Sequence, residues 1–258
     1  MSAMLTAFQR LSLILDILRK ECPWDRVQTI DSLRYLTIEE VYELSEAILA
    51  KDYSEMRKEL GDLFMHLLFY AKIAEDEQLF TTEEALHGIC DKLVSRHPHI
   101  SLPDRAGKMV GGNDNPVPEW EKVKMKEGRK SVLEGVPASL PTLVKAQRMQ
   151  EKVSGMGFDY PSAHEALEKV KEEYGELQEA IVAKDQEQME EEFGDLLFAL
   201  VTWGNHLGIN ADNALSRTNI KFKQRFSYVE EAARRANKAL SDLSLQEMQQ
   251  LWNEAKKS

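Results

Sequence analysis

Residues 172–201, EEYGELQEAIVAKDQEQMEEEFGDLLFALV, decide the fold, because the same pattern occurs once before in the chain. Residues 39–68 read EEVYELSEAILAKDYSEMRKELGDLFMHLL and match them at 16 of 30 positions. Each copy holds a Glu-Glu-x-x-Glu motif and, after fifteen residues, a Glu-x-x-Asp motif. Equal internal spacing in a two-part acidic pattern indicates a duplication, so two related structural units are expected.

Helical periodicity runs through both copies and β-strand signals are scarce, which predicts an all-α fold. Five of the eight prolines and five of the thirteen glycines lie within residues 101–141. Such a concentration is typical of loops and linkers. We therefore predict an N-terminal unit over residues 1–128, a linker over 129–142 and a C-terminal unit over 143–258.

Composition excludes several classes of function. The chain has 258 residues and a net charge of −11 with no basic block to offset it, which argues against nucleic acid as a partner. Two cysteines are too few for a disulfide framework. Neither a signal-peptide core nor a membrane-spanning stretch is found. We expect a cytoplasmic protein without a membrane partner.

The spacing predicts where the acids meet. Helices over about residues 164–183 and 187–207, joined by a turn, place Glu176 about 12 Å before the turn and Glu192 about 10 Å after it. These two carboxylates then lie at one level, and Glu173 and Asp195 lie one turn further along. The first copy is expected to gather the equivalent four acids, Glu40, Glu43, Glu59 and Asp62.

A helical wheel puts Glu173 and Glu192 inside the apolar stripe and Glu176 and Asp195 at its margin. An isolated Glu-Glu-x-x-Glu motif is usually a solvated helix surface. Partly buried, unpaired carboxylates, however, cost several kcal/mol or become protonated. We expect Mg²⁺, with Mn²⁺ as a substitute, to remove that cost, and a substrate phosphate to complete its ligands.

Basic and aromatic residues leave two interpretations open. Lys169 lies on the helix face of Glu173, and Lys221 and Arg225 lie one turn apart on a later helix. They form ordinary helix ion pairs or, beside metal ions, bind phosphate. Trp252 near the C-terminus is a packing residue or stacks on a nucleobase. Trp24, in a Cys-Pro-Trp-Asp turn, is expected to be buried.

The ordered set of motifs resembles the MazG family of nucleoside triphosphate pyrophosphohydrolases, and the resemblance covers nearly the whole chain. Besides the acids, the motifs that carry it are Cys22-Pro23-Trp24-Asp25, Arg96-His97-Pro98-His99, Glu119-Trp120-Glu121, Gly157-Phe158-Asp159 and Lys221-Phe222-x-x-Arg225-Phe226. The order is that of the two-repeat bacterial members. The segment before Cys22 is shorter than in many relatives.

The resemblance implies an all-α fold related to dimeric dUTPases and phosphoribosyl-ATP pyrophosphohydrolases. It implies a homodimer in which helices of two subunits complete four-helix sites, and Mg²⁺-dependent hydrolysis of nucleoside triphosphates to monophosphate and pyrophosphate. The implied metal ligands are Glu173, Glu176, Glu192 and Asp195, with Glu173 or Glu176 as the base. The implied substrate contacts are Lys169, Glu172, Lys221, Arg225 and Trp252.

The two copies differ at one informative position. Leu36 stands where the second copy has Lys169, so the first copy lacks a phosphate-binding cation there. We expect the C-terminal copy to carry most of the activity. A carboxylate-bridged di-iron protein is one alternative, but His66 is replaced by Ala199 in the second copy. A non-catalytic metal-dependent nucleotide sensor or helical regulatory partner is the other.

Overall fold

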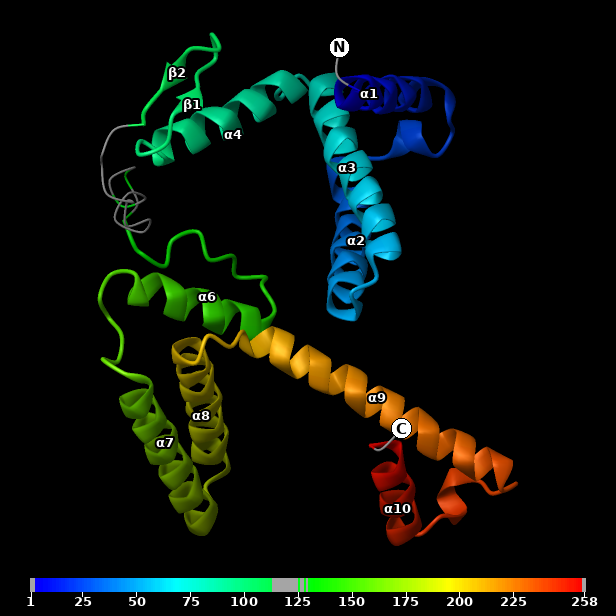
Figure 1. Ribbon diagram of the computed structural model, residues 1–258, viewed down its shortest axis with the longest axis vertical. Coiled ribbons are helices and arrows are strands. Elements are labelled where there is room, and N and C mark those ends of the chain that lie inside the picture. The colour runs from blue at the N-terminus through cyan, green and yellow to red at the C-terminus, as the bar shows by residue number, and fades with distance from the viewer. Residues whose placement is uncertain (1–2, 113–124, 126–127, 129, 257–258) are drawn as a thin grey trace. The chain divides into compact units, whose positions relative to one another are not determined.

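The computed structural model describes residues 3–112, 125, 128 and 130–256 (Figure 1). The chain divides into unit 1, Met1–Pro118, and unit 2, Glu119–Ser258. Unit 1 contains α1 (Ala3–Glu21), η1 (Asp25–Val27), α2 (Ile30–Ala50), α3 (Tyr53–Asp76), α4 (Thr82–Arg96), β1 (Leu102–Pro103) and β2 (Met109–Val110). Unit 2 contains α6 (Thr142–Ser154), α7 (Ala163–Ala183), α8 (Gln186–His206), α9 (Ala211–Arg235), η2 (Leu240–Asp242) and α10 (Leu245–Ala255).

The centre of unit 1 is the antiparallel pair α2 and α3, and α1 packs against α3 (Figure 1). Leu15 of α1, Leu33 of α2, and Phe69 and Ile73 of α3 form its core and are each at most 2% exposed. Removing these side chains from water fixes α1 on one end of the helix pair. Beyond α3, α4 leads to the short antiparallel ribbon β1–β2.

Unit 2 repeats the helix pair as α7 and α8. Here α6 packs against α8 and α9, and α10 packs against α9 (Figure 1). The buried contact between α7 and α8 is built largely from small side chains, among them Ala166, Ala180 and Ala199. Small residues at a helix contact let the two axes approach closely, which brings the side chains of both helices to one seam.

Both helix pairs are closed by the same turn chemistry. Lys51 and Lys184 adopt the left-handed conformation, with φ of 57° and 58°. Asp52 and Asp185 follow, and each carboxylate accepts hydrogen bonds from two backbone N–H groups of the next helix. This N-cap satisfies donors that a helix leaves unpaired at its start. The repeated Ala-Lys-Asp sequence therefore sets the same register between the helices of each pair.

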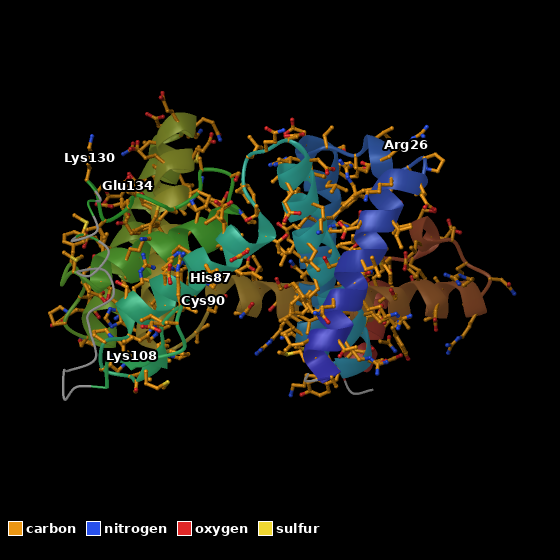
Figure 2. All side chains as sticks on the ribbon, turned by 90° about the horizontal axis from the view of Figure 1, so that it is seen from above. Arg26, His87, Cys90, Lys108, Lys130 and Glu134 are labelled. Carbon is orange, nitrogen blue, oxygen red and sulfur yellow. The ribbon has the colours of Figure 1, made fainter. Side chains whose placement is uncertain are left out.

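The all-α prediction is confirmed. Two details of the expectation differ. Trp24, the residue before η1, is 53% exposed instead of buried. The short closing helix expected around Trp120 and Lys124 lies outside the described residues. Cys22 and Cys90 are free thiols, and Cys90 is exposed on α4 one turn after His87 (Figure 2).

Each helix pair leaves apolar side chains uncovered. Phe64 and Leu67 on α3, Tyr174 and Val182 on α7, and Phe193 on α8 are each more than half exposed. A pair of helices buries only the apolar side chains that face the contact between them, so apolar side chains outside that contact stay exposed. Several large apolar side chains exposed on one helix pair are typical of a protein interface. No helix among the described residues is long and apolar enough to cross a membrane.

Candidate metal and nucleotide site

Three carboxylates meet between α7 and α8 in unit 2. Glu173 comes from α7, Glu192 and Asp195 come from α8, and one oxygen atom of each lies within 4.8 Å of the others. Glu173 is buried at 6% exposure, Glu192 is half-buried and Asp195 is exposed. A set of oxygen ligands that runs from the interior to the surface suits a hard divalent cation open to substrate on one side.

Glu176, the fourth predicted acid, lies on the exposed side of α7 and is not part of this set of three. It is still influenced by the cluster. Partial desolvation, and then the negative charges of Glu173 and Glu192, raise the pKa of Glu176 above its usual value. A carboxylate with a raised pKa is a stronger proton acceptor at neutral pH. The structure therefore brings three of the acids together and leaves Glu176 beside them.

Lys169 compensates part of the charge. Its Nζ atom lies 2.7 Å from a carboxylate oxygen of Glu173, one turn later on α7, and 2.7 Å from one of the exposed Glu172. The hydrogen bonds to Glu172 and Glu173 raise the pKa of Lys169, so the ammonium group stays charged. The expectation that the buried acids are unpaired is wrong for Glu173, because a helical i, i+4 neighbour is always within reach.

Unit 1 holds the equivalent cluster without the lysine. Glu40 and Glu43 of α2 meet Glu59 of α3 within 4.8 Å, and Asp62 is not part of the set. Glu59 is buried at 5% exposure. Desolvation, and then the charge of Glu43, raise the pKa of Glu59 to about 7. Because Leu36 stands at the position of Lys169, no lysine at that position offsets the negative charge of this cluster.

His66, on which the di-iron alternative depends, is not part of the acid cluster of unit 1. Its ring is 4% exposed, and Nδ1 lies 3.0 Å from the hydroxyl oxygen of Thr37. The same hydroxyl lies 2.8 Å from the hydroxyl of Tyr70. A buried hydrogen-bond network accounts for this histidine without a metal ion.

The remaining predicted substrate contacts lie on another part of unit 2. Trp252 of α10 packs against Phe222 of α9, with 5.0 Å between ring centroids. The guanidinium of Arg225 lies over the Trp252 ring at 5.7 Å, a cation–π contact, and Lys221 is exposed one turn earlier on α9. In Figure 1, α9 extends away from the pair α7–α8 and α10 lies against its far half. Within unit 2, these three residues therefore lie apart from the acids of α7 and α8.

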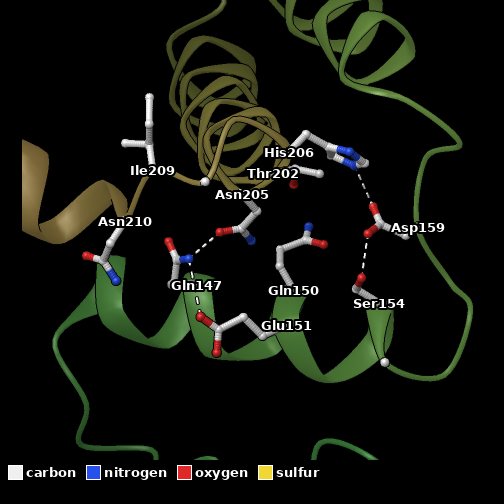
Figure 3. A pocket seen from close by; sticks show the side chains of 12 residues that line it. Gln147, Gln150, Glu151, Ser154, Asp159, Thr202, Asn205, His206, Ile209 and Asn210 are labelled. Carbon is white, nitrogen blue, oxygen red and sulfur yellow. Dashed lines mark hydrogen bonds and ion pairs between the residues drawn. The ribbon is translucent and has the colours of Figure 1, made fainter. Parts of the chain in front are cut away.

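A cavity opens beside the acid cluster, and most of the residues that line it were not predicted from the sequence. It has a volume of about 370 Å³, and Lys169, Glu173 and Asp195 line one part of it. Other lining residues include Gln150, Phe158, Tyr160 and Thr202. A second cavity of about 560 Å³ lies between α6 and the end of α8 (Figure 3). The Gly-Phe-Asp motif at Gly157 was the one sequence signal for this region.

The fold and the site define a class of helical proteins that hold carboxylate clusters between paired helices. In unit 2 the cluster lies next to a cavity that is lined by a lysine. The chain belongs to the MazG family, since the MazG nucleotide pyrophosphohydrolase domain matches residues 28–101 and 162–229. The first match contains the acid cluster of unit 1, and the second contains that of unit 2. The repeat read from the sequence is thus a duplicated MazG domain.

Relatives extend over most of the chain. A nucleoside triphosphate pyrophosphohydrolase of Escherichia coli (strain K12) is 36% identical over 244 residues, which cover 92% of this chain and 90% of that protein. The nucleoside triphosphate pyrophosphohydrolase/pyrophosphatase MazG of Thermotoga maritima is 37% identical over 254 residues, 96% of this chain and 95% of that protein. YabN of Bacillus subtilis (strain 168) is 42% identical over 241 residues but is matched over 48% of its own length.

Proposed function

We propose that this chain hydrolyses nucleoside triphosphates to nucleoside monophosphates and pyrophosphate in the cytoplasm. The observation that carries the proposal is the acid cluster of unit 2. Three carboxylates and a charged lysine converge beside a cavity large enough for a small molecule. Family membership and the names of the relatives in Escherichia coli and Thermotoga maritima point to the same reaction.

The residues fit a divalent cation. Glu173, Glu192 and Asp195 offer oxygen atoms only, within 4.8 Å of one another, and Lys169 offsets only part of their charge. Glu176 is the fourth ligand that we propose. Oxygen ligands favour Mg²⁺, with Mn²⁺ as a substitute. The metal would neutralise triphosphate charge and make a water molecule more acidic.

The protein side chains have separate roles in this proposal. Glu173 or Glu176 accepts a proton from the attacking water. Lys169 orients the triphosphate by its positive charge. Glu172 holds the lysine from the solvent side. Positioning and charge stabilisation, without a covalent intermediate, account for phosphoryl transfer of this type.

We further propose that the active form is a homodimer. The exposed apolar side chains of α7 and α8 would be buried against a second copy, giving a four-helix bundle. Lys221, Arg225 and Trp252 lie away from the acids of their own chain, so the equivalent residues of a second copy are the ones that reach the substrate. Each copy then contributes two helices to the bundle. One site combines the acids of one copy with the basic and aromatic side chains of the other.

The first test measures pyrophosphate release from ATP, GTP, CTP and UTP with and without Mg²⁺. Replacing Glu173 by Gln is expected to lower kcat/KM by at least about 100-fold, because it removes a buried ligand and proton acceptor. Glu40→Gln in unit 1 is expected to change it far less, because that cluster lacks a lysine. Glu179→Ala, an exposed acid on α7, serves as the matched control.

The results separate three interpretations. Loss of activity in Glu40→Gln with Glu173→Gln unaffected would assign the activity to unit 1. Mg²⁺-dependent nucleotide binding without pyrophosphate release would identify a nucleotide sensor in place of an enzyme. Equal turnover with and without divalent cations would exclude the metal-dependent mechanism.

A further inference from the structure

Two cavities of unit 2 lie end to end along one face of α8. Asp195, Ala199 and Thr202 line the cavity at the acid cluster, and Thr202 and His206 line the second cavity. Spacings of three and four residues place these side chains on one face of the helix. A ligand bound at the acids can therefore extend along α8 toward the second cavity.

Gln150 of α6 stands at the junction of the two cavities. It lines both, as do Asp159 and Thr202. Figure 3 shows its amide directed into the space between Asn205 and Asp159. The backbone at Gln150 is held in place because α6 packs against α8 and α9. Any ligand that spans the two cavities must pass this amide group.

The polar neighbours of Gln150 are already engaged. The carboxylate of Asp159 lies 2.8 Å from Nε2 of His206 and accepts a hydrogen bond from the hydroxyl of Ser154 at 2.5 Å. The amide of Gln147 donates to the side-chain oxygen of Asn205. No hydrogen bond involves the side chain of Gln150 within the part of the chain that the structure describes. Its donor and acceptor atoms are therefore available to a ligand.

The dimensions fit a nucleotide. Asp195 and Thr202 are seven residues apart, which is about 10 Å along a helix. Triphosphate at the acid cluster thus leaves the nucleoside beside Gln150. Two aromatic side chains, Phe158 at 81% and Tyr160 at 38% exposure, line the same cavity. Aromatic rings with open faces stack on nucleobases of any type, whereas an amide distinguishes them by their edges.

We propose that Gln150 contacts the edge of the nucleobase and determines which base this site prefers. The inference rests on the proposed function, since it takes a nucleoside triphosphate as the ligand. A glutamine amide presents one acceptor and two donors, so it pairs well with some base edges and leaves unsatisfied groups against others. Gln150 is then a specificity-determining residue that does not act on the phosphates.

The test compares kcat/KM for ATP, GTP, CTP and UTP in the full-length protein with Mg²⁺. Gln150→Ala is expected to change the ratio between the best and worst base by about tenfold, the discrimination of one good amide–base contact. Gln150→Glu keeps the shape but removes the donors and is expected to reorder the bases. Gln188→Ala, on the exposed surface of α8, is the matched control and is expected to keep the ratios.

Each outcome decides the inference. Ratios that stay within about twofold of wild type in both Gln150 variants would overturn it while leaving the proposed function intact. An equal loss for all four bases would also overturn it, because it would assign Gln150 to packing or to the phosphates. Absence of turnover in wild type would overturn the proposed function and this inference together. Thermal unfolding of Gln150→Ala checks that the variant is folded.

Discussion

At the scale of single residues, the two acid clusters have the same spacing but different electrostatics. Lys169 pairs with buried Glu173 in unit 2, whereas Leu36 occupies the corresponding position in unit 1. Glu40, the counterpart of Glu173, therefore has no lysine one helical turn before it, and desolvation raises the pKa of the buried Glu59 on α3 to about 7. The difference at this one position thus changes how far the negative charge of each cluster is compensated. This is the residue-level reason to expect unequal activity.

The raised pKa of Glu59 predicts a pH dependence of stability in the absence of divalent cations. The folded-state pKa, about 7, exceeds the usual value of 4.5, so the folded chain binds this proton more tightly. The resulting stability is present below pH 4.5 and is lost as pH rises through about 7. In EDTA, we expect the thermal midpoint to fall between about pH 5 and about pH 8.

Glu59→Gln should remove that part of the pH dependence, because glutamine does not titrate. Glu39→Gln, an exposed acid on the same hairpin, should leave it unchanged. Calorimetric scans across the pH range, with and without Mg²⁺, measure the effect. An identical slope in wild type and Glu59→Gln would contradict the assignment of the raised pKa.

At the scale of secondary-structure elements, the helix hairpins are set by their turns. Lys184 in the left-handed conformation and Asp185 at the N-cap end α7 and start α8 at fixed positions. A shift by one residue would rotate α8 by about 100° and move Glu192 out of the seam. The turn therefore positions the acids, although it lies about three helical turns away from some of them.

Asp185→Ala tests this contribution. The carboxylate accepts hydrogen bonds from the backbone N–H groups of Glu187 and Gln188. Its loss is expected to lower the free energy of unfolding by about 1 kcal/mol. Urea denaturation followed by circular dichroism measures the change. A comparable loss in the control Glu179→Ala would show that the effect is not due to capping.

At the scale of the whole molecule, each unit displays half of a helical bundle. Phe193 and Tyr174, on the outside of α7 and α8, are more than half exposed, so the described part of unit 2 leaves them uncovered. Burial of such a surface provides about 25 cal/mol per Å². Association of two copies would stabilise both the protein and its active site.

Phe193→Asp is expected to shift the protein from dimer to monomer, because a charge replaces an apolar contact at the proposed interface. Pyrophosphate release should fall with it. Sedimentation velocity over a range of protein concentrations measures the mass. Gln188→Asp introduces the same charge on another face of α8 and should remain dimeric. A monomeric wild type with full activity would refute the dimer proposal.

Much of this protein could be read from the sequence, because helix periodicity, capping residues and i, i+4 spacing are local properties. The repeated Ala-Lys-Asp turn and the fifteen-residue gap between acidic motifs were enough to predict both hairpins and the meeting of Glu173 with Asp195, whereas Glu176, expected level with Glu192, is not part of the set. The wheel put one acid of each helix at the margin, but it did not separate Asp195 and Glu43, which belong to the clusters, from Glu176 and Asp62, which do not.

Only the tertiary structure decided the rest, because contacts between distant segments depend on how helices pack. Sequence spacing carries no information on the angle at which α6 crosses α8, so Gln150 could not be placed beside Thr202. The same holds for Trp252. The local pattern could not decide whether this residue packs against the protein or stacks on a nucleobase, and the structure shows it packed on Phe222. Local spacing thus determined which side chains each helix presents, and packing between helices determined which of them share a cavity.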